Sequence, residues 1–187
     1  MRKEQHHKGW NEIKTNDSWA IFKIMGEFVN GFEKMSKIGP CVSIFGSART
    51  KPDNKYYKLS ENIAKSIVDA GYGVITGGGP GIMEAGMVGA GRDQSIGVSI
   101  RLPFEATANP IIAGDGKFVE MRYFFTRKLM LMKDSQAFIC MPGGFGTLDE
   151  TFELLTLMQT GRGAIAPTVL LDLPGDHFWR TMDEFIH

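Results

Sequence analysis

Short apolar runs rich in β-branched and aromatic residues alternate with helical patterns from residue 41 to the end of this 187-residue sequence. The patterns predict strands over residues 41–46, 73–76, 95–100, 118–121, 136–141 and 168–172, and helices over residues 55–69, 81–91, 122–133, 147–160 and 177–186. Regular alternation of this kind is typical of a parallel sheet with helices on both faces. The sequence therefore predicts a Rossmann-like α/β fold.

The region before the first strand divides into a polar tail and an amphipathic helix. Residues 1–15 are polar and predict a flexible tail. From Asn16 onward, apolar residues recur at helical spacing and predict one face to bury, formed by Ile21, Met25, Phe28, Phe32 and Met35. Lys23, Glu27, Asn30 and Lys34 follow a separate polar line. At roughly 150 residues per domain, residues 16–187 form a single Rossmann-like domain. Its last helical pattern has no glycine cap or proline stop, so either the chain continues or a partner supports its end.

The composition argues against several classes of protein. Lysine plus arginine and aspartate plus glutamate number 21 each, so the chain lacks the excess positive charge of proteins that coat nucleic acids or anionic membranes. Cys41 and Cys140 lie in apolar runs without CxxC spacing, which argues against a disulfide scaffold or a zinc site. No signal-peptide core and no run of about 18 apolar residues is found. We expect a cytoplasmic protein that uses no metal and no cofactor and binds neither nucleic acid nor membrane.

Three unusual loops follow predicted strands. The stretches SIFGSART, ITGGGPGIMEA and CMPGGFGTLDE place in these loops Ser47 and Arg49, then Gly77, Gly78, Gly79 and Gly81, then Gly143, Gly144, Gly146 and Thr147. Because ligands of parallel sheets bind beyond the carboxyl ends of the strands, we expect all three loops to line one crevice.

The glycine loops lack both common nucleotide-binding fingerprints. Glu84 and Asp149 stand where the last glycine of GxGxxG belongs, and Ile111 and Phe118 break the nearest approach to a Walker A motif. The PGGFGT stretch instead opens a helix, whose free backbone N–H groups and positive dipole end favour a phosphate. The alternative is that these glycines serve only tight turns and close packing.

Two charged residues occupy unexpected places on predicted helices. Glu150 heads an apolar row of its helix, which suits either a catalytic carboxylate or a first-turn charge that stabilises the helix dipole. Arg127 lies in the helix predicted over 122–133, which is apolar nearly all the way round and so predicts coverage by a second subunit. A buried arginine needs an anionic partner, either a ligand or Asp134 in a structural pair.

These motifs resemble those of the Lonely guy (LOG) family of nucleotide phosphoribohydrolases, in which a GGGxxGxM stretch precedes an RK pair and a PGGxGTxxE motif. The resemblance covers about residues 42–172 and implies hydrolysis of the N-glycosidic bond of a nucleoside 5′-monophosphate to a free base and ribose 5-phosphate. The substrate would be a cytokinin riboside monophosphate or AMP. Members have been labelled lysine decarboxylases, but no residue here indicates a Schiff-base lysine in a pyridoxal-phosphate site.

The resemblance also implies a set of site residues. Arg127 and Glu150 match the catalytic pair, although Asp149 stands where many members have glutamate. The phosphate-binding loop corresponds to Gly143, Gly144, Gly146 and Thr147. Nucleotide-binding positions correspond to Gly78, Gly79, Glu84 and Lys128, to which the loop after the first strand adds Ser47.

Other functions remain open at this level. Carrier proteins for the molybdenum cofactor look similar in fold and have a related glycine loop, but they would not need Arg127 and Glu150 together. A structural or regulatory relative that senses nucleotides is a third alternative. We expect a small-molecule nucleotide as ligand and a homodimer or higher homo-oligomer, as in the family. The sequence does not indicate which base is preferred.

Overall fold

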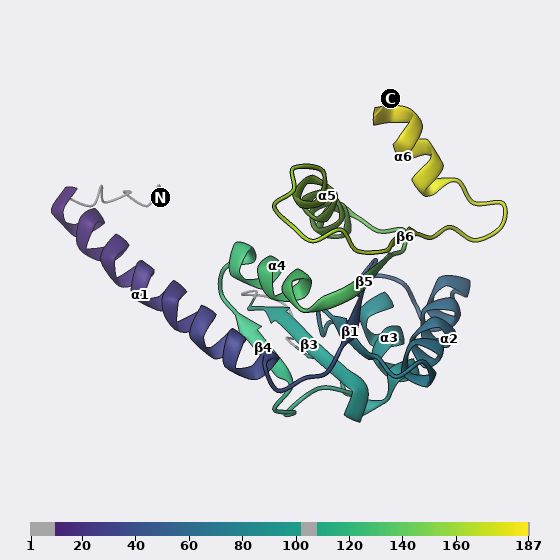
Figure 1. The fold of residues 1–187 in the computed structure, drawn as a ribbon, viewed down its shortest axis with the longest axis horizontal. Coiled ribbons are helices and arrows are strands. Elements are labelled where there is room, and N and C mark those ends of the chain that lie inside the picture. The colour runs from purple at the N-terminus through teal and green to yellow at the C-terminus, as the bar shows by residue number, and fades with distance from the viewer. Residues whose placement is uncertain (1–9, 102–107, 187) are drawn as a thin grey trace, which may run out of the picture.

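The computed structural model describes residues 10–101 and 108–186 of the chain. Their core is a six-stranded sheet in the order β4-β3-β2-β1-β5-β6, in which all neighbouring strands are parallel (Figure 1). The strands are β1 (Cys41–Phe45), β2 (Gly73–Thr76), β3 (Ser95–Ile100), β4 (Phe118–Met121), β5 (Ser135–Cys140) and β6 (Thr168–Leu170). The predicted Rossmann-like α/β fold is confirmed.

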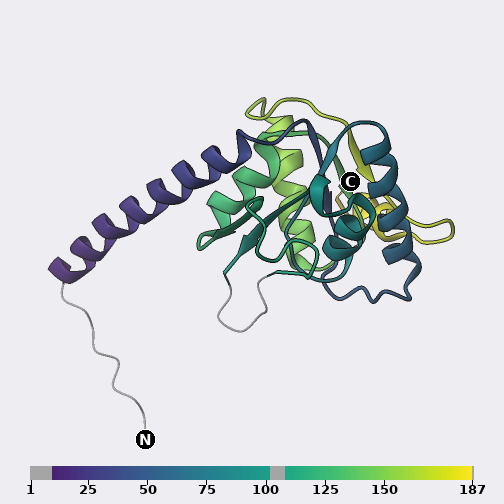
Figure 2. The same cartoon turned by 90° about the horizontal axis from the view of Figure 1, so that it is seen from below.

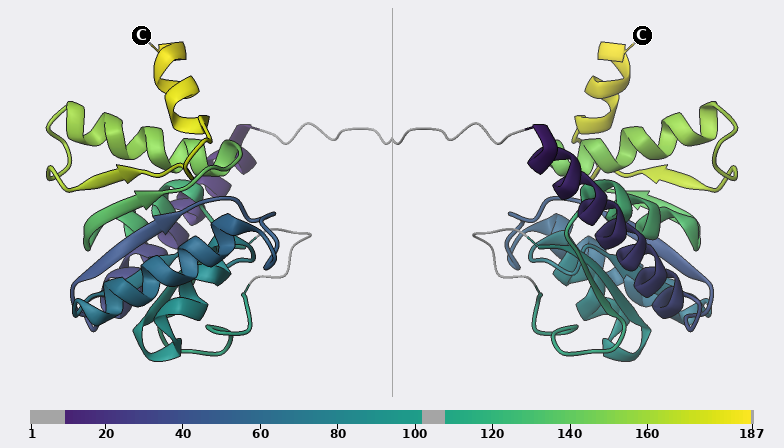
Figure 3. Two further views of the ribbon diagram at one scale, coloured as in Figure 1. Left: turned by 90° about the vertical axis from the view of Figure 1, so that its right-hand side faces the viewer. Right: turned by 90° about the vertical axis from the view of Figure 1, so that its left-hand side faces the viewer.

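Helices cover both faces of this sheet. One face carries α2 (Lys55–Asp69) and α3 (Ile82–Ala90), and the other carries α4 (Phe124–Lys133) and α5 (Phe145–Gln159). Residues of α1 (Trp10–Met35) and α6 (Phe178–Ile186) join the core on the α4 side. The two views of Figure 3 show α2 in front of the sheet from one side and α1 in front of it from the other. A short 3₁₀ turn (Arg92–Gln94) precedes β3.

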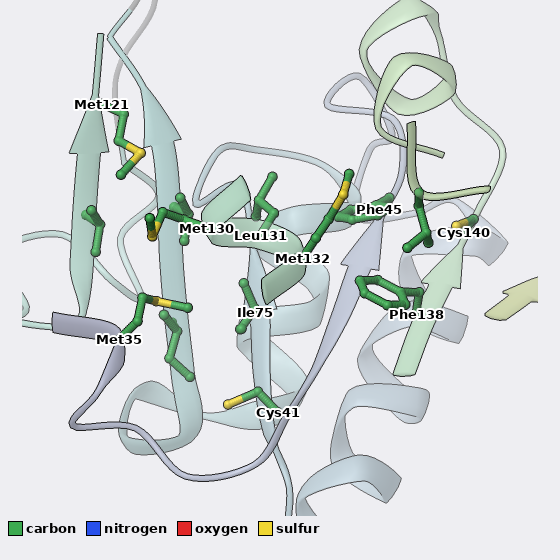
Figure 4. Close-up of a cluster of buried hydrophobic side chains, with 14 of the residues drawn as sticks. Met35, Cys41, Phe45, Ile75, Met121, Met130, Leu131, Met132, Phe138 and Cys140 are labelled. Carbon is green, nitrogen blue, oxygen red and sulfur yellow. The ribbon is translucent and has the colours of Figure 1, made fainter. Parts of the chain in front are cut away.

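The burial of β1 explains why both faces need a cover. All five of its residues are buried, and successive side chains of a strand point to opposite faces. Cys41 and Phe45 belong to the core on the α4 side, where Phe45 lies beside Phe138 (Figure 4). Ile44 belongs to the core under α2 and α3. A strand that is apolar on both faces is typical of the centre of a parallel sheet.

The order of the strands creates a crevice at one edge of the sheet. From β1 the chain steps through β2, β3 and β4 on one side and then returns to place β5 and β6 on the other side. The loop after β1 leads to α2 on one face, whereas the loop after β5 leads to α5 on the opposite face. Loops that diverge in this way open a crevice at the carboxyl ends of the two strands.

Helix α1 is present, but it begins at Trp10, so residues 10–15 of the predicted tail are helical. The rest of that tail lies outside the described residues. Of the predicted apolar face, Met35 is buried, whereas Ile21, Met25 and Phe32 are 57%, 56% and 46% exposed. Figure 2 shows the N-terminal part of α1 running out from the domain. The described part of the chain therefore leaves most of this apolar face uncovered. Neither α1 nor any other helix described is long and apolar enough to cross a bilayer.

Candidate active site

A cavity lies at the carboxyl ends of β1 and β5. Its volume is about 550 Å³. Residues from the loop after β1, from α3 and α4 and from the start of α5 line it, namely Gly46, Ser47, Ala48, Arg49, Met83, Arg127, Gly144, Phe145, Gly146, Thr147, Leu148 and Glu150. The stretches after β1 and β5 thus meet here, together with Arg127 and Glu150. The stretch after β2 contributes Met83 but none of its glycines, so the prediction that all three loops line one crevice is confirmed only in part.

Arg127 and Glu150 form a buried ion pair in this cavity. They come from α4 and α5 and are 8% and 9% exposed. The Nη1 atom of Arg127 donates to Oε1 of Glu150 at 2.5 Å, and its Nε donates to the carbonyl of Val98 at 2.9 Å. Asp134 is paired with Lys133 instead, so the alternative of an Arg127–Asp134 pair is wrong. The arginine is held at two points, with its remaining donors available to a ligand.

Glu150 holds its proton more strongly in this cavity than a glutamate does in water, because its pKa is raised. Burial raises the pKa of Glu150, and the neighbouring charge and hydrogen bond of Arg127 oppose that rise. Asp149, the next residue along α5, raises the pKa further. A carboxyl group tuned in this direction is a better proton acceptor at neutral pH than a free glutamate.

The thiol of Cys140, at the end of β5, offers no nucleophile at neutral pH. Burial raises the pKa of this thiol to about 11, and the charge of Glu150 contributes to the rise. Since the thiolate is the reactive form of cysteine, Cys140 stays inert at neutral pH. Among the described residues that line the cavity, Glu150 is the carboxylic acid that could exchange a proton with a ligand.

The start of α5 is suited to an anion. Gly144 is its N-cap residue and supplies no side-chain cap. Leu148 donates its backbone N–H to the carbonyl of Gly144, which closes the first turn. The backbone N–H groups of residues 145–147 precede this first hydrogen bond and have no acceptor within the helix. All three residues line the cavity. With the cation of Arg49 on the same lining, they form a natural cradle for a phosphate.

Two glycines leave room for the side chains of the site. A Cβ atom added to Gly77 would lie 2.4 Å from Nη2 of Arg127 and 2.6 Å from the sulfur of Met83. One added to Gly143 would lie 2.1 Å from the hydroxyl oxygen of Thr147. Any other residue at these positions would displace the side chains next to them, so the site depends on glycine here for space.

Asn109 holds the glycine loop that follows β2. It is 5% exposed, and its backbone N–H and side-chain amide donate to the carbonyls of Gly78 and Gly79 at 2.8 and 3.1 Å. Its side-chain oxygen accepts from the backbone N–H of Ile111 at 3.1 Å, which turns its own segment. Gly78 adopts a φ of +70°, a conformation that favours glycine. Asn109 thereby fixes the loop that supports Arg127 through Gly77.

Comparison with known proteins shows the family to which this chain belongs. The family model described as "Possible lysine decarboxylase" matches residues 74–187. This chain belongs to the LOG family. It is 29% identical to the cytokinin riboside 5′-monophosphate phosphoribohydrolase LOG of Oryza sativa subsp. japonica over 69% of this chain and 53% of that protein. It is 28% identical to the cytokinin riboside 5′-monophosphate phosphoribohydrolase of Rhodococcoides fascians over 78% of this chain and 73% of that protein. The chain thus spans about half the length of the rice relative.

Solved structures share the fold of this LOG-family chain. Two of them align with a TM-score of 0.57 at 20% identity. One is the molybdenum cofactor binding protein from the phototrophic bacterium Rippkaea orientalis, where the match covers 80% of this chain and 85% of that one. At this level of identity the likeness concerns the fold alone.

The residues carried over from the LOG motifs divide into two groups. Ser47, Arg127, Gly144, Gly146, Thr147 and Glu150 line the cavity. The others stand beside it in the described part of the chain. Gly143 packs against Thr147, while Gly78 and Gly79 are held by Asn109. Glu84 faces α2, since its charge raises the pKa of Tyr57 there.

Lys128, the second residue of the RK pair, joins α4 to α5 instead of pointing into the cavity. It forms ion pairs with Asp149, at 3.3 Å, and with Glu153. These carboxylates, Glu153 most of all, raise the pKa of the Lys128 amine. Its nucleotide-binding role stays a prediction, and its contacts indicate that it fixes the spacing of the helices that carry Arg127 and Glu150.

Several residues of the site were not predicted from the sequence, among them Phe145, Gly77 and Asn109. Phe145, which is 94% exposed on the cavity lining, lies inside the PGGFGT stretch and could have been noted there. Gly77 was seen only as one of several glycines in its loop. Asn109 acts across about thirty residues of sequence, and its Asn-Pro dipeptide indicates a turn but not the loop it fixes.

Proposed function

We propose that this protein hydrolyses the N-glycosidic bond of a purine nucleoside 5′-monophosphate to a free base and ribose 5-phosphate. The observation that carries the proposal is the buried Arg127–Glu150 pair beside an anion-suited helix start in one cavity. The names of the relatives support the same reaction class, with a cytokinin riboside monophosphate as substrate. AMP is the alternative substrate that we propose.

Each group in the cavity has a definable task in this reaction. The 5′-phosphate binds at the start of α5, where Gly144, Gly146 and Thr147 line the cavity. This contact anchors the ribose with its C1′ atom toward Glu150. The Glu150 carboxylate stabilises positive charge on the ribose as the C1′–N bond breaks, and it accepts a proton from the water that attacks C1′. The departing base takes the electron pair of the broken bond and a proton from solvent.

Arg127 contributes charge and position, not a proton. A guanidinium stays protonated at any ordinary pH, so it is a poor acid. Its two contacts, to Glu150 and to the carbonyl of Val98, orient it before substrate arrives. We assign it to holding the Glu150 carboxylate in place and to stabilising negative charge of the bound nucleotide.

The decarboxylase named in the family description does not fit these residues. A pyridoxal-phosphate enzyme needs a lysine to form the Schiff base. Among the described residues that line the cavity, none is lysine. Lys128 is engaged by Asp149 and Glu153 outside it. The chemistry available in the cavity is that of a carboxylate and a guanidinium.

The test is release of base and sugar phosphate. The protein is incubated with AMP and, separately, with isopentenyladenosine monophosphate, and free base and ribose 5-phosphate are measured by chromatography. We expect Glu150→Gln to lower kcat by roughly 10²- to 10⁴-fold, the range of a lost general base, while nucleotide still binds. Glu33→Gln is the matched control, because this carboxylate is exposed on α1, pairs with Lys37 and lies outside the cavity lining.

Two results would reject the proposal or its assignment. Nucleotide binding that raises the melting temperature, without release from either substrate, would favour a non-catalytic carrier or sensor of phosphorylated ligands. Turnover that survives in Glu150→Gln would show that another group performs the chemistry.

A further inference from the structure

Helix α1 meets the domain through polar and small residues as well as through Phe28 and Met35. Gly31 is buried, and a Cβ atom added to it would lie 2.9 Å from Cε of Met121 and 3.0 Å from the sulfur of Met130. One turn later, Nζ of Lys34 donates to the carbonyl of Phe118 at 3.0 Å. One turn earlier, on the same face, lies Glu27. The polar line read from the sequence is thus part of the face that docks α1 onto β4 and α4.

Glu27 contacts both the segment that leads into α4 and the first turn of that helix. Its Oε1 accepts the backbone N–H of Arg122 at 2.7 Å, and its Oε2 lies 2.8 Å from the hydroxyl of Thr126. The same hydroxyl lies 2.8 Å from the carbonyl of Tyr123, the N-cap residue. Tyr123 supplies no side-chain cap of its own. A residue 95 positions away in sequence from Arg122 therefore joins the segment before α4 to the first turn of the helix.

The turn that Glu27 holds is the one that carries Arg127. Arg127 directly follows Thr126, and its backbone N–H donates to the carbonyl of Tyr123 at 3.2 Å. A carboxylate at this end of a helix also interacts favourably with the helix dipole. Movement of this turn would shift the guanidinium relative to Glu150, which is fixed separately on α5. Small displacements of this kind are costly for catalysis.

We propose that Glu27 is a positioning residue, which fixes the first turn of α4 and thereby sets the placement of Arg127 against Glu150. This proposal rests on the proposed function for its effect on turnover. The contacts that carry it, from Glu27 to Arg122 and Thr126, do not depend on that function. Helix α1 is then part of the machinery of the site although it lies outside the cavity.

The experiment compares three variants of the full chain. Glu27→Ala removes both contacts to α4. Glu27→Gln keeps an oxygen for the N–H of Arg122 and an amide that can donate to the hydroxyl of Thr126. Lys34→Ala removes a neighbouring contact of α1 without touching α4. For each we measure the melting temperature, kcat and KM with the better nucleotide substrate, and amide hydrogen exchange over residues 122–133.

We expect Glu27→Ala to lower kcat about tenfold, with KM changed less than about twofold, because positioning acts mainly on the transition state. Glu27→Gln should recover most of the loss, and Lys34→Ala should leave kcat unchanged. Exchange at the start of α4 should accelerate in Glu27→Ala alone. If Glu27→Ala and Lys34→Ala lower the melting temperature alike and leave kcat at the wild-type value, the role is only structural and the proposal is overturned.

Failure of the proposed function is separable from failure of this inference. If the wild-type protein releases no base, the proposed function is rejected, and hydrogen exchange without substrate still decides the role of Glu27. Faster exchange at the start of α4 in Glu27→Ala than in the other two variants would support it. Equal exchange in all three would overturn it.

Discussion

At the scale of single residues, Arg127 and Glu150 each offset the free-energy cost of removing the other's charge from water. An ionised side chain removed from water needs a partner of opposite charge and further hydrogen bonds, and Arg127 finds both in Glu150 and Val98. The pair itself adds little to stability, because well-packed apolar residues in its place would often make a protein at least as stable. Burial is the larger influence on Glu150 and leaves its pKa raised.

The raised pKa of Glu150 predicts how stability depends on pH. A free glutamate has a pKa of about 4.3, so the folded protein keeps this proton at pH values where the unfolded chain has lost it. The stabilising effect of that proton is complete below the unfolded pKa and is lost as the pH rises through the folded pKa. We expect the free energy of unfolding of the wild type, minus that of Glu150→Gln, to fall as the pH rises from about 4.

Urea unfolding at a series of pH values measures this difference. The subtraction removes the contribution of titrating groups that the two proteins share. A difference that instead grows with pH would contradict the prediction, because it would mean that the attraction of Arg127 outweighs burial and lowers the pKa of Glu150.

The sequence was informative about residues whose chemistry is local. Arg127 and Glu150 could be singled out because each is charged within an apolar helical pattern, and the family motifs then gave them roles. Asn109 and Glu27 could not be found in this way. Their partners lie about thirty and more than ninety residues away, and only the folded chain brings them together.

At the scale of elements, the start of α5 depends on how Gly143 and Thr147 pack. With a Cβ on Gly143 only 2.1 Å from the Thr147 hydroxyl oxygen, Gly143→Ala must push this buried side chain or the loop away. We expect a loss of roughly 1–3 kcal/mol in the free energy of unfolding, as for other overpacked sites. We also expect about tenfold weaker binding of ribose 5-phosphate, which corresponds to roughly 1.4 kcal/mol.

Denaturant unfolding and calorimetric titration measure the two effects. Gly146→Ala is the matched control for stability, because an added Cβ there meets no atom within 4 Å and alanine favours a helix. Equal free energies of unfolding for the two variants would contradict this prediction, because they would show that the close approach of Gly143 and Thr147 does not affect stability.

The identity of the elements could be predicted from the sequence better than their ends or their faces. Periodicity and apolar runs gave every strand of the sheet and the helices between them. The helix predicted from residue 147 begins at Phe145, because Gly144 acts as its N-cap. For α1 the predicted apolar face matched the contacts only in part, since Met35 and Phe28 pack on the core whereas Ile21, Met25 and Phe32 are exposed. The pattern assigns apolar residues to the core, whereas Glu27 and Lys34 make specific hydrogen bonds to the domain.

At the scale of the whole molecule, an apolar surface extends over α1 and α4. Its members are Trp19, Ile21, Phe22, Met25, Val29 and Phe32 on α1, and Phe124, Phe125 and Leu129 on α4, all at least 40% exposed. The rings of Phe28 and Phe125 lie 6.5 Å apart and connect the two helices, so the surface is continuous. Monomers rarely expose an apolar patch larger than a few hundred Å². The patch predicts an interface.

The homodimer predicted from the sequence stays a proposal, and this surface is where we place it. A twofold dimer needs one patch that is complementary to itself, and two apolar helical surfaces meet that need without matched charges. It would also account for the exposed half of α4, a helix that is apolar nearly all the way round.

We expect the wild type to be a dimer and Phe22→Lys to be a monomer with the same fold, as measured by light scattering after size exclusion. Val88→Lys, an exposed apolar site on α3 at the other face of the sheet, should remain dimeric. A monomeric wild type, or dissociation of both variants alike, would rule out this surface as the interface, because only Phe22→Lys places a charge in it.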